Sequence, residues 1–324
     1  MIDRRKIIAL VGGATLAWPL ELHGQEPGRV YRLGWLVPTA QPGRPYFAAF
    51  ADELRRSGFV EGQNLQVDFR APVPLDKAGD IAQVVVAAGV DAIFTSGNPL
   101  IRSVQEATRT VPLVVIADDL VLSGLVRSLA HPDGNTTGVS ILATELDGKR
   151  QQLLMELVPG GRHIAALAED GVTAPEQLHT LEAAARAHSV ELSLYRVAKA
   201  EELVPAIDSA HAAGAEALNV LASTLFSVNQ KLVIDHAAAL KLPAIYQWPE
   251  EAEAGGLAAY GPRQSAMARQ NARQVVKIFH GAEPGDLPVE QPDRFELVIN
   301  LKTEKALGLT IPEAMLDRAD KVVE

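Results

Sequence analysis

The hydrophobic and polar positions of the chain follow two alternating periods from residue 31 onward. Short apolar runs, typical of buried strands, are followed by longer segments whose apolar residues lie three and four apart, as in a helix. In the first half, strands are predicted over 31–37, 65–69, 91–95 and 112–117, and helices over 45–58, 75–88 and 99–109. This alternation favours a parallel sheet with helices on both faces.

The same pattern restarts after residue 162. Strands are predicted over 163–168, 192–197, 216–221 and 243–246, and helices over 175–188, 201–213 and 228–240. Two successive sets of four strand–helix units predict an α/β protein with two doubly wound parallel-sheet lobes. A chain of 324 residues is long enough for each lobe to bury a core of its own.

Segments rich in turn-forming residues separate the predicted lobes. The stretch HPDGNTTG at 131–138 has no apolar period and predicts the first crossing between lobes. A second crossing is predicted near Gly261 and Pro262, before a long helix over 263–279, and a third over 288–292, before a last strand at 295–299. We therefore expect lobe 1 to comprise residues 29–138 and 262–290, and lobe 2 residues 139–261 and 291–324, joined by a multi-strand hinge.

The first 24 residues have the pattern of an export signal. Arg4, Arg5 and Lys6 form a basic start, an apolar stretch follows over 7–20, and a polar spacer begins at Gln25. The apolar stretch is too short to be a stable membrane anchor. We therefore predict a signal peptide over 1–24 and a periplasmic protein, and the pair Arg4-Arg5 points to the twin-arginine route of export. A frayed amphipathic helix is the alternative interpretation.

Composition narrows the chemistry further. The net charge of −10, without a basic stripe, argues against a nucleic-acid partner. The absence of cysteine excludes disulfides, thiolate metal sites and cysteine nucleophiles. The histidines form no metal-binding motif, and the phosphate-binding and nucleophile-elbow motifs of α/β enzymes are missing. We expect no catalytic residue, no metal and no cofactor, in a monomeric protein.

The loop after the third predicted strand is the best candidate anion site. Ligands of parallel α/β sheets bind at the carboxyl ends of the strands, where loops enter helices. This loop contains Ser96, Gly97, Asn98 and Pro99. Glycine lets a ligand approach the backbone, and a helix starting at Pro99 offers free N–H groups, so a ligand carboxylate is predicted to bind Ser96 and Asn98. Capping of the helix by Asn98 alone is the alternative.

Two further positions of the first half lie at the same predicted edge. Thr39 follows the first strand, and Asp118 follows the fourth. The carboxylate of Asp118 is a candidate partner for a ligand ammonium group. A cap for the following helix is the alternative role at this position.

The equivalent edge of the second half carries four candidate contact residues, Ser223, Thr224, Gln247 and Trp248. Trp248 and Tyr246 are candidates for stacking on a planar ligand. For Trp248, packing beneath a helix is the alternative. Tyr260, at the second predicted crossing, belongs either to the wall of the cleft or to the packing of the hinge.

Longer stretches of the chain resemble a known family. They include GFVEGQNLQVDFR at 58–70, DAIFTSGNPL at 91–100, SGLVRSLAHPDGNTTGVS at 123–140 and FELVINLKTEKALGLTIPEAMLDRADKVVE at 295–324. These stretches resemble ABC-transporter substrate-binding proteins of the tryptophan-binding-protein-like type, and the resemblance covers essentially the whole chain after the leader. It implies the type I periplasmic binding fold.

The resemblance also implies a function. The protein is expected to capture a small ligand in the interlobe cleft by hinge closure, without catalysis, and to deliver it to an ABC permease of the inner membrane. Family ligands are mostly aromatic amino acids, so an aromatic amino acid is favoured, while an aliphatic amino acid or an aromatic carboxylate stays open. Two other classes remain as alternatives: a two-lobed α/β enzyme acting on a small molecule, and a sensory ligand-binding domain.

Overall fold

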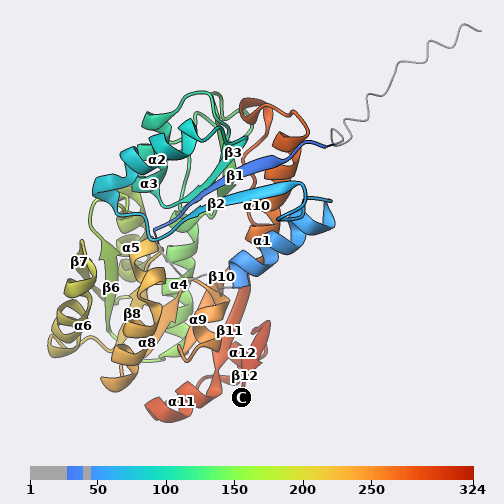
Figure 1. Cartoon of the computed structure of the whole chain (residues 1–324). Coiled ribbons are helices and arrows are strands. Elements are labelled where there is room, and N and C mark those ends of the chain that lie inside the picture. The colour runs from blue at the N-terminus through green and yellow to red at the C-terminus, as the bar shows by residue number, and fades with distance from the viewer. Residues whose placement is uncertain (1–27, 39–44) are drawn as a thin grey trace, which may run out of the picture.

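Two α/β lobes, each built on its own sheet, make up the structure (Figure 1). The computed structural model describes residues 28–38 and 45–324. The predicted leader at 1–24 and the candidate Thr39 therefore lie outside the described residues. Within those ranges, no helix combines the length and apolar character that crossing a bilayer requires.

The sheet of lobe 1 has five parallel strands in the order β2-β1-β3-β4-β5. Its strands are β1 (Tyr31–Leu36), β2 (Leu65–Arg70), β3 (Ala92–Ser96), β4 (Leu113–Ala117) and β5 (Thr136–Ser140). The helices around it are α1 (Pro45–Arg56), α2 (Ala78–Ala87), α3 (Asn98–Ala107) and α10 (Gln264–Phe279). Because α10 comes from much later in the chain, this lobe is assembled from two separate segments.

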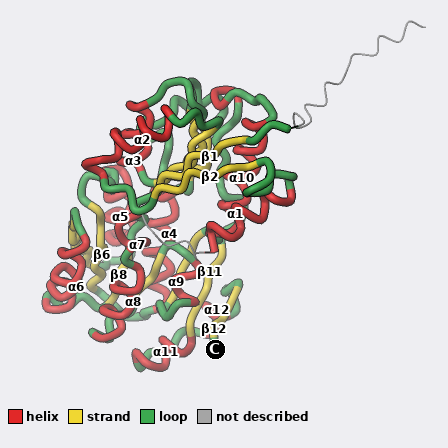
Figure 2. The backbone as a smooth tube through the Cα atoms, viewed as in Figure 1, coloured by secondary structure: helices red, strands yellow, loops and turns green. Residues whose placement is uncertain are grey.

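The sheet of lobe 2 has seven strands in the order β12-β11-β10-β9-β8-β6-β7, and β11 runs antiparallel to β10. Its strands are β6 (His163–Glu169), β7 (Glu191–Val197), β8 (Ala217–Val220), β9 (Ala244–Tyr246), β10 (Ala258–Gly261), β11 (Glu296–Asn300) and β12 (Lys321–Val323). Its helices are α4 (Ala143–Leu157), α5 (Pro175–Ala187), α6 (Leu203–Ala212), α7 (Thr224–Val228), α8 (Gln230–Ala239), α9 (Pro249–Glu253), α11 (Leu301–Leu307) and α12 (Glu313–Leu316). Figure 2 shows both sheets wrapped by helices.

Apolar side chains cover both faces of each sheet. In lobe 1, α1 and α10 pack on the face that carries Trp35 and Phe94, whereas α2 and α3 pack on the face that carries Ile93. In lobe 2, α6 and α8 pack against Leu167, and α4 covers the opposite face near Ile245. The doubly wound α/β class predicted from the alternating pattern is confirmed, and the carboxyl ends of both sets of parallel strands face the space between the lobes.

Strand β5 departs from the pattern-based prediction. Residues 131–138 were expected to form a crossing without a strand, but β5 occupies 136–140 and belongs to the first sheet. Its Thr136 and Thr137 are buried, and Gly138 lets the backbone pass close to Val115, where a Cβ would lie 1.9 Å from the carbonyl oxygen. A short buried strand made of polar and small residues leaves no apolar period to detect.

Helix α4 was not predicted either, although it has 15 residues. Its buried face carries Asp147, Arg150 and Gln151 beside its leucines. Polar residues on the inner face remove the apolar stripe by which a helix is recognised in sequence. The missed helix therefore marks a polar core beneath the cleft.

Three chain segments connect the lobes. The first joins β5 to α4, the second joins β10 to α10, and the third leads from the end of α10 to β11. The first and third segments are tied together, because Ser140 N donates to Glu290 O at 3.0 Å and Glu290 N donates to Gly138 O at 2.9 Å. Because of these hydrogen bonds, the first and third connections run side by side between the lobes.

Candidate functional site

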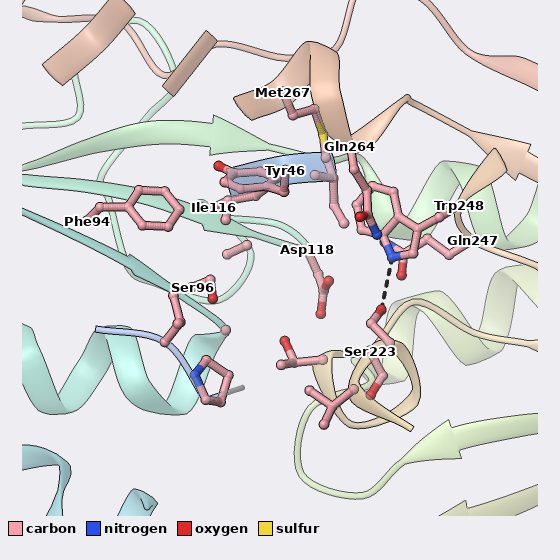
Figure 3. Close-up of a pocket in the computed structure, with 18 of the residues that line it drawn as sticks. Tyr46, Phe94, Ser96, Ile116, Asp118, Ser223, Gln247, Trp248, Gln264 and Met267 are labelled. Atoms are coloured by element: carbon pink, nitrogen blue, oxygen red, sulfur yellow. Dashed lines mark hydrogen bonds between the residues drawn. The ribbon is translucent and has the colours of Figure 1, made fainter. Parts of the chain in front are cut away.

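A cavity of about 130 Å³ lies between the lobes at the carboxyl ends of the strands. Since one water needs roughly 10–15 Å³ of such space, the cavity holds on the order of ten water-sized groups. That room suits a single amino acid better than a peptide or an oligosaccharide. Figure 3 shows its lining residues converging from both lobes.

Aromatic rings from lobe 1 form one wall of the cavity. Trp35 on β1 and Phe94 on β3 are register partners, and their ring centroids lie 4.4 Å apart. Tyr46 and Phe47 come from the first turn of α1, with Phe47 5.0 Å from Trp35 and Tyr46 5.7 Å from Phe94. The phenol of Tyr46 accepts a hydrogen bond from Asn271 Nδ2 on α10 at 2.7 Å, which fixes the ring. This wall offers flat faces to a planar ligand.

Asp118 supplies the charge of the site. It follows β4, its side chain is half-buried, and Figure 3 shows its carboxyl group in the space between Ser96 and Ser223. Burial, followed by the negative charges of Asp147 and Glu169, raises the pKa of Asp118 to about 7. A carboxylate held in this way is stabilised by an incoming cation, which would lower its pKa again.

Asp118 is also the only charged side chain in the cavity wall, as far as the described residues go. The described lining contains no lysine, arginine or histidine. Its other polar side chains are neutral hydroxyls and amides, among them Ser96, Thr224 and Gln264. The wall therefore carries one potential negative charge and several uncharged donors.

Hydrogen bonds hold the wall that lobe 2 contributes. Ser223 caps α7, where its hydroxyl accepts from Phe226 N at 3.3 Å and donates to Glu169 Oε2. Burial is the largest cause of a raised pKa at Glu169. Trp248 Nε1 donates to Ser227 Oγ at 2.9 Å, and this bond is the dashed line in Figure 3. The indole is thus fixed at its polar edge while its ring faces the cavity.

The lobes touch each other at one side of the cavity. Gly97 has a φ of 83°, and a Cβ placed there would lie 3.0 Å from Thr224 Oγ1 in the other lobe. Any side chain at position 97 would be strained in this backbone region and crowded by Thr224. The glycine thus allows close approach of the lobes as well as of a ligand.

A buried ionic network lies behind the wall of lobe 2. Asp147 and Arg150 on α4 are fully buried and form an ion pair. Asp147 also accepts from Ala222 N at 3.1 Å, next to Ser223, and Arg150 Nη1 donates to Tyr260 O at 3.0 Å. The network therefore ties α4 to the loop after β8 and to the end of β10.

Six of the ten candidate residues line the cavity, namely Ser96, Asp118, Ser223, Thr224, Gln247 and Trp248. Asn98 and Pro99 do not. Gly97, not Asn98, occupies the N-cap of α3, and Asn98 Nδ2 donates to Ser123 Oγ at 2.9 Å. Tyr260 does not line the cavity either; it lies in β10, next to the connection to α10, with its ring centroid 6.2 Å from that of Phe295.

The sequence interpretation missed the aromatic wall and the contribution of α10. Trp35 and Phe94 were assigned only to buried strands, and Gln264 and Met267 follow the second crossing. The sequence did contain a signal for Phe94. Residues two apart on a strand point to the same face, and Phe94 lies two positions before the candidate Ser96. Tyr246, considered for stacking, is instead buried in the lobe 2 core against Gly256. Strand β9 ends at Tyr246, so Trp248 lies beyond the strand and lines the cavity although Tyr246 does not.

Comparisons with known proteins bear on this site. The profile of the family described as ABC transporter substrate binding protein matches residues 45–323. The chain belongs to this family. A protein of Clostridioides difficile (strain R20291) named tyrosine-binding protein is 27% identical over 263 residues, covering 80% of this chain and 75% of the relative.

Solved structures show the same fold. A conserved domain protein from Vibrio cholerae matches with a TM-score of 0.84 and 26% identity, over 91% of this chain and 100% of that one. A domain from Streptococcus pneumoniae, solved in complex with L-Trp, matches with a TM-score of 0.82 and 24% identity over the same shares. The family description is that of a substrate-binding protein. No cluster of three or more potential metal ligands occurs in the described part of the chain.

Proposed function

We propose that this protein is the periplasmic solute-binding component of an ABC importer and captures an aromatic amino acid between its lobes by hinge closure. One observation carries the proposal: Asp118 brings a single carboxylate to a cavity that is also lined by aromatic rings. An ammonium group on Asp118 would leave the ligand ring against Phe94 and Tyr46. The neutral donors at Ser96 and Ser223 remain for the ligand carboxylate.

The charge of the cavity selects between ligand classes. An amino acid brings its own cation to Asp118, so the buried pair is balanced. An aromatic carboxylate without an amine would place two negative charges in the same cavity, where the described walls hold no basic residue. The site therefore favours an amino acid over an aromatic carboxylate.

Other features support transport. The names of the relatives, a tyrosine-binding protein and a domain solved with L-Trp, agree with an aromatic amino acid as ligand. The leader pattern at 1–24 and the family membership support an exported protein that serves a membrane permease. Three connections between the lobes support closure about a hinge, which a ligand that contacts both lobes would favour.

Isothermal titration calorimetry of the purified protein tests the ligand assignment. L-tyrosine and L-tryptophan should bind, whereas 3-(4-hydroxyphenyl)propionate, which lacks the amine, should bind far more weakly. Asp118→Asn should weaken tyrosine binding at least about thirtyfold, since losing one partner of a buried charge pair costs about 2–5 kcal/mol.

The neighbouring carboxylate provides a matched control. Asp119 lies outside the cavity wall, and its Oδ1 accepts from Val121 N and Leu122 N at 3.0 and 2.9 Å. Asp119→Asn keeps these hydrogen bonds and removes only the smallest of the charges that shift the pKa of Asp118, so it should change the affinity far less than Asp118→Asn. Equal binding of tyrosine and of the propionate, or undiminished binding by Asp118→Asn, would contradict the proposed function.

A further inference from the structure

Helix α10 brings an unpaired amide group to the interlobe cavity. Gln264 is the first residue of this helix and lines the cavity, and only 8% of its surface is exposed. Its backbone N–H donates to Glu250 Oε1 at 3.1 Å, whereas its side-chain amide has no hydrogen-bond partner among the described residues. Buried polar groups normally find a partner, so this amide is available to a ligand.

The backbone of Gln264 is held from lobe 2, although α10 packs in the core of lobe 1. The preceding residue, Arg263, binds Glu253 Oε1 through Nη1 at 2.6 Å and Glu296 Oε2 through Nε at 2.7 Å. These two carboxylates and that of Glu250 all belong to lobe 2. The start of α10 is therefore fixed in place before a ligand arrives, which limits the entropy that is lost when the amide binds.

The amide lies near the place where aromatic residues of both lobes meet. Met267, one turn further along α10, packs with Trp248 of lobe 2, and Tyr46 contacts the same apolar cluster. Residues three apart on a helix share a face, and Figure 3 shows Gln264 on the same side of Asp118 as Tyr46. A ligand whose ammonium group lies on Asp118 and whose ring lies against Tyr46 therefore extends toward the Gln264 amide.

Aromatic amino acids differ in what they offer to an amide. A glutamine side chain supplies both a hydrogen-bond donor and an acceptor. The phenol hydroxyl of tyrosine can use either, the indole N–H of tryptophan can donate to the amide oxygen, and the phenyl ring of phenylalanine offers neither. When phenylalanine binds, the amide exchanges contact with water for no partner, which costs binding free energy.

We propose that Gln264 is a specificity-determining residue whose amide hydrogen-bonds a polar atom on the ligand ring, so that the site favours tyrosine and tryptophan over phenylalanine. This inference rests on the proposed function, because the ammonium group on Asp118 sets the orientation of the ring. Gln247, the other glutamine in the described cavity wall, lies between β9 and α9 and is the competing candidate for this role.

Calorimetry with a matched pair of ligands tests the assignment. L-tyrosine should bind the unmodified protein at least about fivefold more tightly than L-phenylalanine, which lacks only the hydroxyl. Gln264→Met replaces the amide by an apolar chain of similar length. It should reduce this ratio to below about twofold, with phenylalanine bound at least as tightly as before, which also shows that the variant folds. Gln264→Leu serves the same purpose if Gln264→Met does not fold.

A glutamine on the same helix provides the control. Gln270 lies outside the cavity wall, and its Nε2 donates to Gln291 O at 3.1 Å. Gln270→Met should therefore change neither affinity.

The outcomes separate the role of Gln264 from the function of the protein. Equal affinities of tyrosine and phenylalanine for the unmodified protein would overturn the role and leave the proposed function intact. An unchanged ratio in Gln264→Met would also overturn it, and a lowered ratio in Gln247→Met would then assign the role to that residue. Failure of all aromatic amino acids to bind would refute the proposed function itself.

Discussion

The two walls of the interlobe cavity are built on different physical principles. Lobe 1 contributes rings that are held by packing against other rings, such as Trp35 against Phe94 and Phe50. Lobe 2 contributes residues that are held by hydrogen bonds, such as Ser223 on Glu169 and Trp248 on Ser227. A packed apolar wall adapts to ligand shape, whereas a hydrogen-bonded wall keeps its donors in fixed directions.

Asp118 fits neither description, because it belongs to lobe 1 but interacts electrostatically with lobe 2. It follows a strand of lobe 1, but three of the four charges that shift its pKa belong to lobe 2, namely those of Asp147, Glu169 and Arg150, while the fourth and smallest is that of Asp119 beside it. Its protonation therefore depends on how closely the lobes approach each other. Complementarity to ligand shape, the direction of hydrogen bonds and the charge of the cavity therefore come from three separate parts of the site. Substitutions can change these parts one at a time.

The largest effect is expected from breaking the ionic network behind the wall of lobe 2. Arg150→Met leaves the fully buried Asp147 without its cation, which should lower the free energy of unfolding by about 3–5 kcal/mol. Urea unfolding measures this loss. Arg318→Met removes the partner of Glu156 in a half-exposed pair and should cost less than about 1 kcal/mol. Similar losses in both variants would show that the buried network does not stabilise this wall.

The pH dependence of binding tests the charge that links the walls. Because the pKa of Asp118 is raised to about 7 in the free protein, the ionised form that holds an ammonium group is scarce below that pH. The apparent affinity for tyrosine should rise about tenfold from about pH 6 to about pH 8, with release of protons that calorimetry in two buffers detects. A flat profile in the unmodified protein would contradict this role, and Asp118→Asn should abolish the dependence.

The same group has the opposite effect on folding. An acid whose pKa is higher in the folded than in the unfolded chain binds extra protons when folded. Between about pH 4 and about pH 7, the contribution of Asp118 to the unfolding free energy of the ligand-free protein should therefore fall as pH rises. Comparing urea unfolding of the protein and of Asp118→Asn across this window isolates that contribution.

The smallest effect is expected in the aromatic wall. Phe94→Leu removes one ring face and should weaken tyrosine binding about three- to tenfold, since aromatic pairs contribute about 0.5–1.5 kcal/mol beyond area burial. Phe279→Leu is a matched control, because Phe279 is buried in the same core but does not line the cavity. Equal affinities of the two variants would show that the wall acts through core packing alone.

Much of the fold could be predicted because its strands and helices differ in apolar period. The predicted strand at 163–168 corresponds to β6 at His163–Glu169, and the long helix at 263–279 corresponds to α10 at Gln264–Phe279. The prediction failed where buried positions are polar, as in α4 with Asp147 and Arg150, and in β5 with its threonines. Periodicity detects apolar burial only, so a polar interior is invisible to it.

The site was predictable to the extent that it follows strand ends. That rule identified Asp118, Ser223 and Trp248, which do line the cavity. Asn98 does not line the cavity, because the chain enters α3 directly after Gly97 and the Asn98 side chain points toward Ser123. Trp35 and Phe94 were not chosen, although Phe94 shares a strand face with Ser96, because an aromatic residue on a buried strand packs a core in most cases.

Helix α10 belongs to the core of lobe 1, although it is synthesised after most of lobe 2. Its Val275, Ile278 and Phe279 complete the core around Tyr31 and Phe59, residues made more than two hundred positions earlier. The sheet of lobe 2, in turn, is complete only after β11 and β12, near the end of the chain, have been synthesised. During translation, both lobes therefore stay incomplete until nearly the whole chain has emerged, and we expect them to mature together instead of one after the other.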